Sequence, residues 1–506
     1  MSTGSESPHS TPTNLDTLLH GYSFADLEKI NEDPIVVTVA GHANHGKTSI
    51  IRTFTRDRKF GEVRDEPGVT QEVGFTRFIL QGKTYLKLYD TPGFQYSSLA
   101  IEECGELAQI EDFERFFQDD TYRHDRLALE QARNSHIILY VIDVSQPPSE
   151  RLRDDFHILS KCLVPVLPLF NFVGNKRDNH ESEWKTTLRR FNYHEFTRYD
   201  AHHYSPAHEQ QLYKRMIEKL DDDPLHRKFL QWRSADSRRR NEEMAKQARR
   251  AIAEMLVDCV SYRESATGVT KETRKDVEAI VVDRFRKQIQ DREFQAFQQI
   301  LEIYDIEPTR LHNQGDAGQA APLWTREVFS KDSLRVFGKG VGGGVIGGAT
   351  TGGTIDAFVG GASFGTGAVI GGLIGGLAGF FGTAIDKRQY DEETGTVVIQ
   401  ADRDMWQMLT GRAAALLKDV QHCGAASDAE FEITTKPPHF AKKQLAELNQ
   451  TMEQVASQPR FTDSQLGRII ARPLAPRLQA QRTEFVASIE RWLRENLDSP
   501  NDLIGY

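Results

Sequence analysis

The chain has 506 residues, a formal net charge of -10 at pH 7 and a pI of about 5.9. Because this length exceeds one hydrophobic core, we expect about two to four domains. The acidic balance argues against a protein that coats nucleic acid through its whole surface. Four cysteines without a CxxC pair argue against a disulfide framework or a zinc site and favour a reducing compartment.

The N-terminal part begins with a loose tail, residues 1–33, which is rich in Ser, Thr, Pro and acids and has no secretory signal pattern. From 34 to 210, short apolar runs alternate with polar helical stretches, which predicts an α/β domain with a mostly parallel sheet. Gln81-Gly82-Lys83 separates two strand-like runs and predicts one antiparallel hairpin. The acidic stretch 102–125 predicts a helical insertion. The apolar runs are 35–40, 86–89, 137–142 and 164–172.

The rest of the chain is predicted to be mostly helical. A charged helical arm occupies 211–330, a glycine-rich hairpin 331–388 and a mostly helical domain 389–506. Within the last domain, 394–401 reads as a strand, and 406–420 and 444–496 read as helix. Within the arm, apolar residues at helical spacing form one stripe along a helix. Its residues are Val277, Ile280, Val281, Phe285, Ile289, Phe297, Ile300 and Leu301.

A phosphate-binding loop is the strongest local pattern. Residues 41–48, Gly-His-Ala-Asn-His-Gly-Lys-Thr, fit GxxxxGK[ST] between an apolar strand and the expected start of a helix. Glycines let the backbone N–H groups face an anion, Lys47 neutralises the β and γ oxygens, and Thr48 can ligate Mg²⁺. The residues expected to contact the nucleotide here are Gly41, Asn44, His45, Gly46, Lys47, Thr48 and Ser49.

Three further motifs follow in the order expected of a GTPase. Residues 90–93, Asp-Thr-Pro-Gly, follow a strand, so Asp90 can reach Mg²⁺ and the Gly93 amide can face the γ-phosphate. Thr70 lies between the two motifs and can close over the metal. Residues 175–178, Asn-Lys-Arg-Asp, suit the guanine edge, because a carboxylate accepts two hydrogen bonds that adenine cannot donate.

Taken alone, each of these short motifs is as typical of an ordinary turn, but their order indicates a GTP site. The expected catalytic residues are Lys47, Thr70 and Gly93. The expected Mg²⁺ ligands are Thr48, Thr70 and Asp90. The expected guanine-binding residues are Asn175, Lys176 and Asp178.

On these motifs, residues 37–51 and 67–93 resemble the TRAFAC-class GTPase domains of the Era, TrmE and translation-factor group. The Gly-His-x-x-His-Gly-Lys-Thr form is typical of translation factors. Together with Asn171-Phe172 and the glycine-rich segment, most of the chain from 34 onward resembles a bacterial GTPase family whose C-terminal half is a domain of unknown function. The resemblance implies GTP and GDP as ligands, Mg²⁺ as cofactor, and hydrolysis of GTP to GDP and phosphate.

The chain departs from that pattern at two positions. Phe94 occupies the place where many GTPases have a water-orienting glutamine, so Gln95, His45 or a partner has to assist hydrolysis. Asn171 ends the strand before the guanine motif, so Asn171 and Asn175 both remain candidates for contacting the base. Asn44 matches the loop asparagine that binds K⁺ in some relatives, and it is equally suited to a turn.

Residues 338–385 form the most unusual segment. Between Gly338 and Gly382 lie 19 of the chain's 38 glycines, and no charged residue occurs from Ala357 to Ile385. Glycines four apart let helices approach closely in a bilayer, and basic residues flank the segment on both sides. We therefore expect a membrane hairpin with cytoplasmic ends, at the inner face of the plasma membrane. A glycine-rich helical pair in soluble protein, or a flexible linker, is the alternative.

The combined pattern predicts a regulatory GTPase that couples nucleotide state to a membrane-associated helical half, by analogy with dynamin-like proteins. A homo-oligomer is a further candidate partner. One rival is a ribosome- or RNA-associated GTPase, although no β-barrel pattern follows residue 210, and RNA and DNA are not the expected partners. A second rival is a non-catalytic GTP-binding membrane scaffold. The basic run 225–250 most often marks a solvated helix face, and it also suits anionic lipid or RNA.

Overall fold

The computed structural model describes residues 33–60, 73–80, 83–149, 151–174, 179–220, 224–313, 386–433, 440, 442–458 and 476–497. It has two compact units. The first comprises Met1–Asn241 and Gly424–Ser427, and the second comprises Glu242–Cys423 and Asp428–Tyr506.

A six-stranded sheet forms the centre of the first unit, in the order β2-β3-β1-β4-β5-β6. All neighbouring strands are parallel except β2 and β3, which form the predicted hairpin. The strands are β1 (Ile35–Gly41), β2 (Gly74–Leu80), β3 (Lys83–Asp90), β4 (Ile137–Asp143), β5 (Val166–Asn171) and β6 (Thr197–Arg198). Most of this sheet, as predicted from the apolar runs, is therefore parallel.

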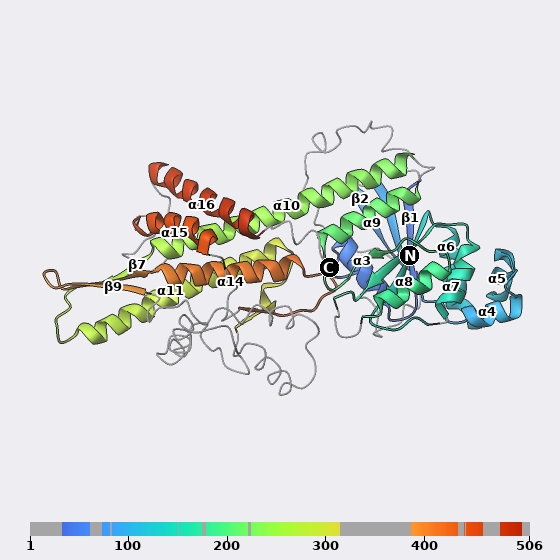
Figure 1. The fold of residues 1–506 in the computed structure, drawn as a ribbon, viewed down its shortest axis with the longest axis horizontal. Coiled ribbons are helices and arrows are strands. Elements are labelled where there is room, and N and C mark those ends of the chain that lie inside the picture. Colours follow the sequence, from blue (N-terminus) through green and yellow to red (C-terminus); the bar gives the residue numbers. More distant parts are fainter. Residues whose placement is uncertain are drawn as a thin grey trace. The chain divides into compact units, whose positions relative to one another are not determined.

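Helices cover both faces of this sheet (Figure 1). Along β4, Ile137, Leu139 and Val141 join one apolar cluster, while Ile138 and Tyr140 join the other. Burial on both faces explains why the strands read as continuous apolar runs. The helices are α3 (Lys47–Thr55), α4 (Ser97–Cys104), α5 (Ile110–Phe116), η1 (Asp120–Tyr122), α6 (Arg123–Arg133), α7 (Arg151–Ser160), α8 (Glu181–Arg190), α9 (Pro206–Lys219) and α10 (Pro224–Ser261).

The second unit is rich in helix, as predicted. It contains the part of α10 from Glu242 onward, α11 (Arg274–Ile303), η2 (Pro308–Arg310), α14 (Arg403–Gln421), α15 (Lys442–Ala456) and α16 (Pro476–Leu497). The predicted apolar stripe of α11 is buried at Val281, Phe285 and Ile289, whereas Ile280 is 55% exposed. Phe297, Ile300 and Leu301 are also fully buried, so the stripe faces the core from Val281 onward.

Two small sheets in the second unit were only partly predicted. β7 (Arg263–Ala266), β10 (Thr396–Ala401) and β9 (Asp386–Asp391) pair antiparallel, and β8 (Leu311–Asn313) pairs with β11 (Phe431–Ile433). β10 shows the alternating burial of a strand with one covered face and was predicted. β7 and β9 are polar strands that pair with β10, so their own sequences carry little strand signal.

The structure confirms the α/β domain followed by a helix-rich part. The expected tail and the glycine-rich segment 338–385 lie outside the described residues, and the domain boundaries near 210, 330 and 388 stay predictions. None of the helices in the described ranges combines the length and hydropathy needed to span a bilayer.

Candidate nucleotide-binding site

The phosphate loop joins the end of β1 to the start of α3. Gly46, the N-cap of α3, has φ 86°, and a Cβ there would lie 2.4 Å from the Asn171 side-chain nitrogen. Asn44 also adopts a left-handed conformation, with φ 64°. This tight curl requires glycine at 46 and suits the turn role of Asn44. The loop therefore has the predicted place, between a strand and a helix N-terminus.

Lys47 and Thr48 open α3 and face the loop. Lys47 is 7% exposed, and its Nζ donates to the carbonyl oxygens of Gly41 at 3.1 Å and His42 at 3.0 Å. Burial lowers the pKa of Lys47, and the nearby Asp90 carboxylate opposes that shift. Thr48 Oγ1 donates to Asp90 Oδ2 at 2.5 Å. Two hard oxygen ligands side by side at a helix N-terminus fit Mg²⁺.

The Asp90–Gly93 segment packs directly against the phosphate loop. Thr91 Oγ1 donates to the Val39 carbonyl at 2.9 Å, and a Cβ on Gly93 would lie 2.7 Å from the Ala43 nitrogen. Only glycine allows this approach. The structure thus brings Lys47, Thr48 and the Asp90–Gly93 segment together, whereas Thr70 lies outside the described residues.

Asn171 joins the phosphate loop to the loop after β6. It is fully buried, its Nδ2 donates to the His45 carbonyl at 3.0 Å, and its Oδ1 accepts the Ala201 N–H at 3.0 Å. Asp200 accepts the N–H groups of Gly174, His202 and His203 at 2.9–3.1 Å. Residues 175–178, with Asn175, Lys176 and Asp178, lie outside the described residues, so the guanine-binding residues stay a prediction.

Phe94, in the usual glutamine position, and His45, one of the expected aids to hydrolysis, both make contacts inside the protein. Phe94 is 3% exposed within an apolar cluster. Burial lowers the pKa of His45 to about 4, so its ring is neutral at pH 7. Its Nδ1 lies 3.2 Å from the Val141 carbonyl, and because a carbonyl only accepts, Nδ1 carries the proton. His45 therefore serves to hold the loop on β4.

Sequence reasoning missed two buried carboxylates next to the Asp90–Gly93 segment. Asp125 Oδ1 on α6 accepts the backbone N–H groups of Gln95 and Tyr96, each at 2.9 Å. Asp155 on α7 is 1% exposed and accepts the Tyr140 hydroxyl at 2.5 Å. Burial raises the pKa of Asp155 to about 7. The available signal was an acid on the apolar face of α7, at helical spacing from Leu152 and Leu159.

A second group of potential metal ligands lies at the starts of β1, β4 and α10. Ligand atoms of Asp33, His136 and His226 lie within 4.8 Å of one another. However, the Val36 N–H donates to His136 Nδ1 at 2.9 Å, so a neutral His136 carries its proton on Nε2. His226 Nε2 donates to the Asp33 carbonyl at 2.7 Å. These hydrogen bonds tie both histidine rings to the protein backbone, which favours a structural role over metal binding.

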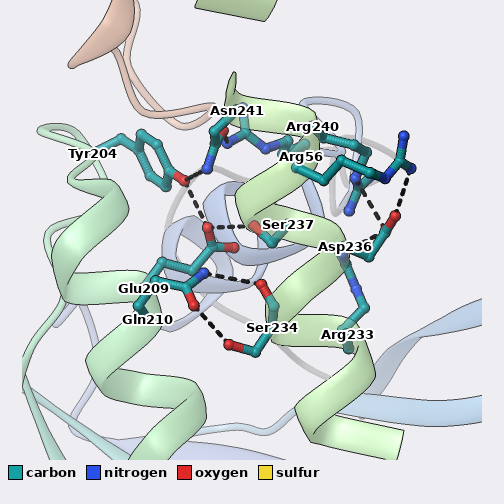
Figure 2. Close-up of polar contacts among 11 residues, drawn as sticks. Arg56, Tyr204, Glu209, Gln210, Arg233, Ser234, Asp236, Ser237, Arg240 and Asn241 are labelled. Atoms are coloured by element: carbon teal, nitrogen blue, oxygen red, sulfur yellow. Dashed lines mark hydrogen bonds and ion pairs between the residues drawn. The ribbon is translucent and has the colours of Figure 1, made fainter. Parts of the chain in front are cut away.

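A buried polar network connects the end of the phosphate-loop helix to α9 and α10 (Figure 2). Arg56, just after α3, donates to Asn241 Oδ1 at 2.6 Å and lies over the Tyr204 ring at 4.7 Å. The Tyr204 hydroxyl and Ser237 Oγ donate to Glu209 Oε2 at 2.6 and 2.7 Å. Glu209 is 1% exposed. The network therefore fixes the part of α10 that precedes Glu242.

Comparisons with known proteins agree with this geometry. Residues 36–172 match the family described as 50S ribosome-binding GTPase. The tRNA modification GTPase MnmE of Geotalea uraniireducens is 27% identical over 166 residues, 33% of this chain and 30% of MnmE. GTPase Der of Campylobacter concisus is 26% identical over 149 residues, 29% of this chain and 27% of Der. The probable GTP-binding protein EngB of Desulfotalea psychrophila is 26% identical over 172 residues, 33% of this chain and 80% of EngB.

The chain thus spans under a third of the length of the MnmE and Der relatives. Residues 185–486, more than half of the chain, match the family described as Domain of unknown function (DUF3482). The chain belongs to the DUF3482 family and carries an N-terminal GTPase domain related to MnmE, Der and EngB.

Proposed function

We propose that this protein is a Mg²⁺-dependent GTPase that acts as a switch on its own helical half. The observation that carries the proposal is the convergence of Lys47, Thr48, Asp90 and Gly93 around one phosphate loop. Such a convergence suits positioning and electrostatic stabilisation of a transferring phosphoryl group, which is most of what a GTPase contributes.

Each residue has a distinct task in this proposal. The Lys47 ammonium, already lying inside the loop, neutralises charge that grows on the β and γ oxygens. Thr48 and Asp90 hold Mg²⁺, which supplies further charge compensation, and Thr70 joins them. The Gly93 N–H donates to the γ-phosphate. Asn175, Lys176 and Asp178 select guanine, with Asn171 holding the phosphate loop in register.

The polar network around Glu209 supports coupling to the second unit. It begins at Arg56, directly after the phosphate-loop helix, and ends at Asn241, the last residue of α10 in the first unit. Because α10 also contains residues of the second unit, a shift of α3 that reaches Asn241 acts on a helix that both units share.

A lipid bilayer is the partner we propose for the second unit, through residues 338–385, with the protein on the inner face of the plasma membrane. Their length without charge and their flanking basic residues support it. A ribosomal partner is the second candidate, because the matched GTPase family is described as 50S ribosome-binding. K⁺ binding at Asn44 and homo-oligomers belong to the same proposal.

Steady-state phosphate release by the purified full chain tests the enzyme, with GTP, ATP and no nucleotide compared at fixed Mg²⁺. We expect release with GTP only, and stimulation by anionic liposomes. If 50S subunits stimulate phosphate release and liposomes do not, the ribosome and not the bilayer is the partner. If the protein binds GTP tightly but does not hydrolyse it under any of these conditions, the GTPase proposal is wrong and a non-catalytic GTP-binding scaffold is the better account.

A further inference from the structure

One task of the proposed GTPase is the orientation of the attacking water, and the described residues in and beside the phosphate loop differ in whether they can perform it. Phe94 is buried among apolar side chains, and His45 is neutral and donates to the Val141 carbonyl. Phe94 therefore cannot hold a water beside a γ-phosphate, and the Nδ1–H of His45 is already engaged with β4. A polar side chain elsewhere in the chain, or a partner, has to do so.

Gln95 is the next residue along, and α6 holds both its backbone and its side chain. Asp125 Oδ1 accepts the N–H groups of Gln95 and Tyr96. The exposed Gln95 Nε2 lies 3.4 Å from Nδ1 of His124, the neighbour of Asp125. When His124 Nδ1 accepts from this amide nitrogen, the Gln95 Oε1 remains to accept a hydrogen bond from water.

The same segment is fixed at the next two residues as well. Ser97 is hydrogen-bonded to Asp155, and Ser98 Oγ donates to Asp154 Oδ2 at 2.6 Å. Four consecutive residues after Phe94 thus have side-chain partners on α6 or α7. A segment held in this way presents its one solvent-facing amide in a narrow range of positions, which is what orienting a water requires.

We infer that Gln95 orients the water that attacks the γ-phosphate, and that His124 and Asp125 are its positioning residues. In that step the water oxygen bonds to the γ-phosphorus, and the bond from phosphorus to the β–γ bridging oxygen breaks with its electron pair passing to GDP. The proton lost by the water leaves on the phosphate product. Gln95 accepts a hydrogen bond and keeps its own protons. This inference rests on the proposed GTPase function.

Single-turnover hydrolysis and the affinity for a non-hydrolysable GTP analogue, measured on the full chain, separate positioning from binding. We expect Gln95→Ala to slow hydrolysis by about 10- to 100-fold with analogue affinity unchanged. His124→Ala should slow it by a smaller factor, roughly 3- to 10-fold. Gln118→Ala, an exposed glutamine between α5 and η1, is the matched control and should hydrolyse like the wild type.

Asp125 is tested by a pair of variants. Asp125→Ala removes the acceptor for both N–H groups and should slow hydrolysis at unchanged analogue affinity, whereas Asp125→Asn keeps an acceptor and should restore the rate to within about threefold. Loss of analogue binding in Asp125→Ala, or failure of Asp125→Asn to restore the rate, would overturn the positioning role of Asp125.

The wild type distinguishes this inference from the proposed function. If it hydrolyses GTP and Gln95→Ala hydrolyses at the same rate, the inference is wrong and the GTPase stands. If the wild type binds the analogue but never hydrolyses GTP, the proposed function and the inference both fall.

Discussion

At the scale of single residues, Lys47 and Thr48 carry the phosphate-site assignment. Lys47→Ala removes a buried ammonium that lies within 3.1 Å of two loop carbonyls, and Thr48→Ala removes the hydroxyl that contacts Asp90. We expect GTP affinity to fall by at least about tenfold in each variant, because charge compensation or Mg²⁺ ligation is lost. Isothermal titration with GTP and Mg²⁺ measures this.

Ser98→Ala is a suitable control for these two variants, since it removes a hydroxyl hydrogen bond from the exposed Ser98 on α4 to the half-buried Asp154 on α7. Its GTP affinity should equal that of the wild type. Unchanged affinity in both Lys47→Ala and Thr48→Ala would show that the nucleotide binds elsewhere.

Asp155 makes the stability of the first unit depend on pH. Its pKa is about 7 in the folded protein because of burial, against 3.8 for an ordinary aspartate. The folded state therefore holds more protons than the unfolded chain between about pH 4 and pH 7, so this contribution to stability falls as pH rises through that window. From pH 5 to pH 8 the unfolding free energy should fall in both proteins, and the fall should be about 2–3 kcal/mol smaller in Asp155→Asn than in the wild type.

Urea unfolding at both pH values measures the difference, and comparing the two proteins cancels the other titrating groups. Asp154→Asn, at the half-buried neighbour on α7, should keep most of the wild-type pH dependence, because the Asp154 charge is a minor cause of the raised pKa of Asp155. A wild-type pH dependence that Asp155→Asn leaves intact would mean that Asp155 is ionised throughout.

At the scale of elements, a helix, strand or turn could be predicted from the sequence where its own local residue pattern determines it. The apolar run of β4 predicted a buried strand, and the glycines of the phosphate loop predicted a tight turn; the structure has both. β7 was missed because Arg263–Ala266 is a strand only by pairing with β10. Asp125 was missed because its role depends on which backbone N–H groups the fold brings to it, and no local pattern encodes that contact.

The first half of α10 is held to α9 by buried hydrogen bonds that meet at Glu209 (Figure 2). Glu209→Ala leaves the Tyr204 and Ser237 hydroxyls without this acceptor and removes the negative charge beside Arg56. We expect a loss of about 3 kcal/mol in unfolding free energy and faster amide exchange at the end of this helix segment. Hydrogen exchange resolved by peptide reports both α9 and α10.

Gln211→Ala, an exposed position on α9 two residues further on, is the matched control for Glu209→Ala. Glu209→Gln keeps an acceptor and should lose less stability than Glu209→Ala. Equal protection of residues 233–241 in the wild type and Glu209→Ala would mean that apolar packing alone holds this part of α10.

At the scale of the whole molecule, the glycine-rich segment is inserted between two anchored elements of the second unit. β8, which ends at Asn313, pairs with β11, and β9, which begins at Asp386, pairs with β10. Each anchor therefore has its own partner strand. A deletion of residues 338–385 keeps both anchors and leaves 314–337 as a linker, which reaches up to roughly 80 Å when extended.

We predict that the deleted protein folds and keeps wild-type GTP affinity, but no longer floats with anionic liposomes and no longer responds to them in GTP turnover. In lipid, a helix satisfies its own backbone hydrogen bonds, so glycine costs less there than in water while close helix packing remains. Gly371→Leu with Gly375→Leu raises hydrophobicity and blocks that packing. This double variant should float but lose the lipid response. Flotation of the deleted protein at the wild-type level would exclude 338–385 as the membrane-binding segment.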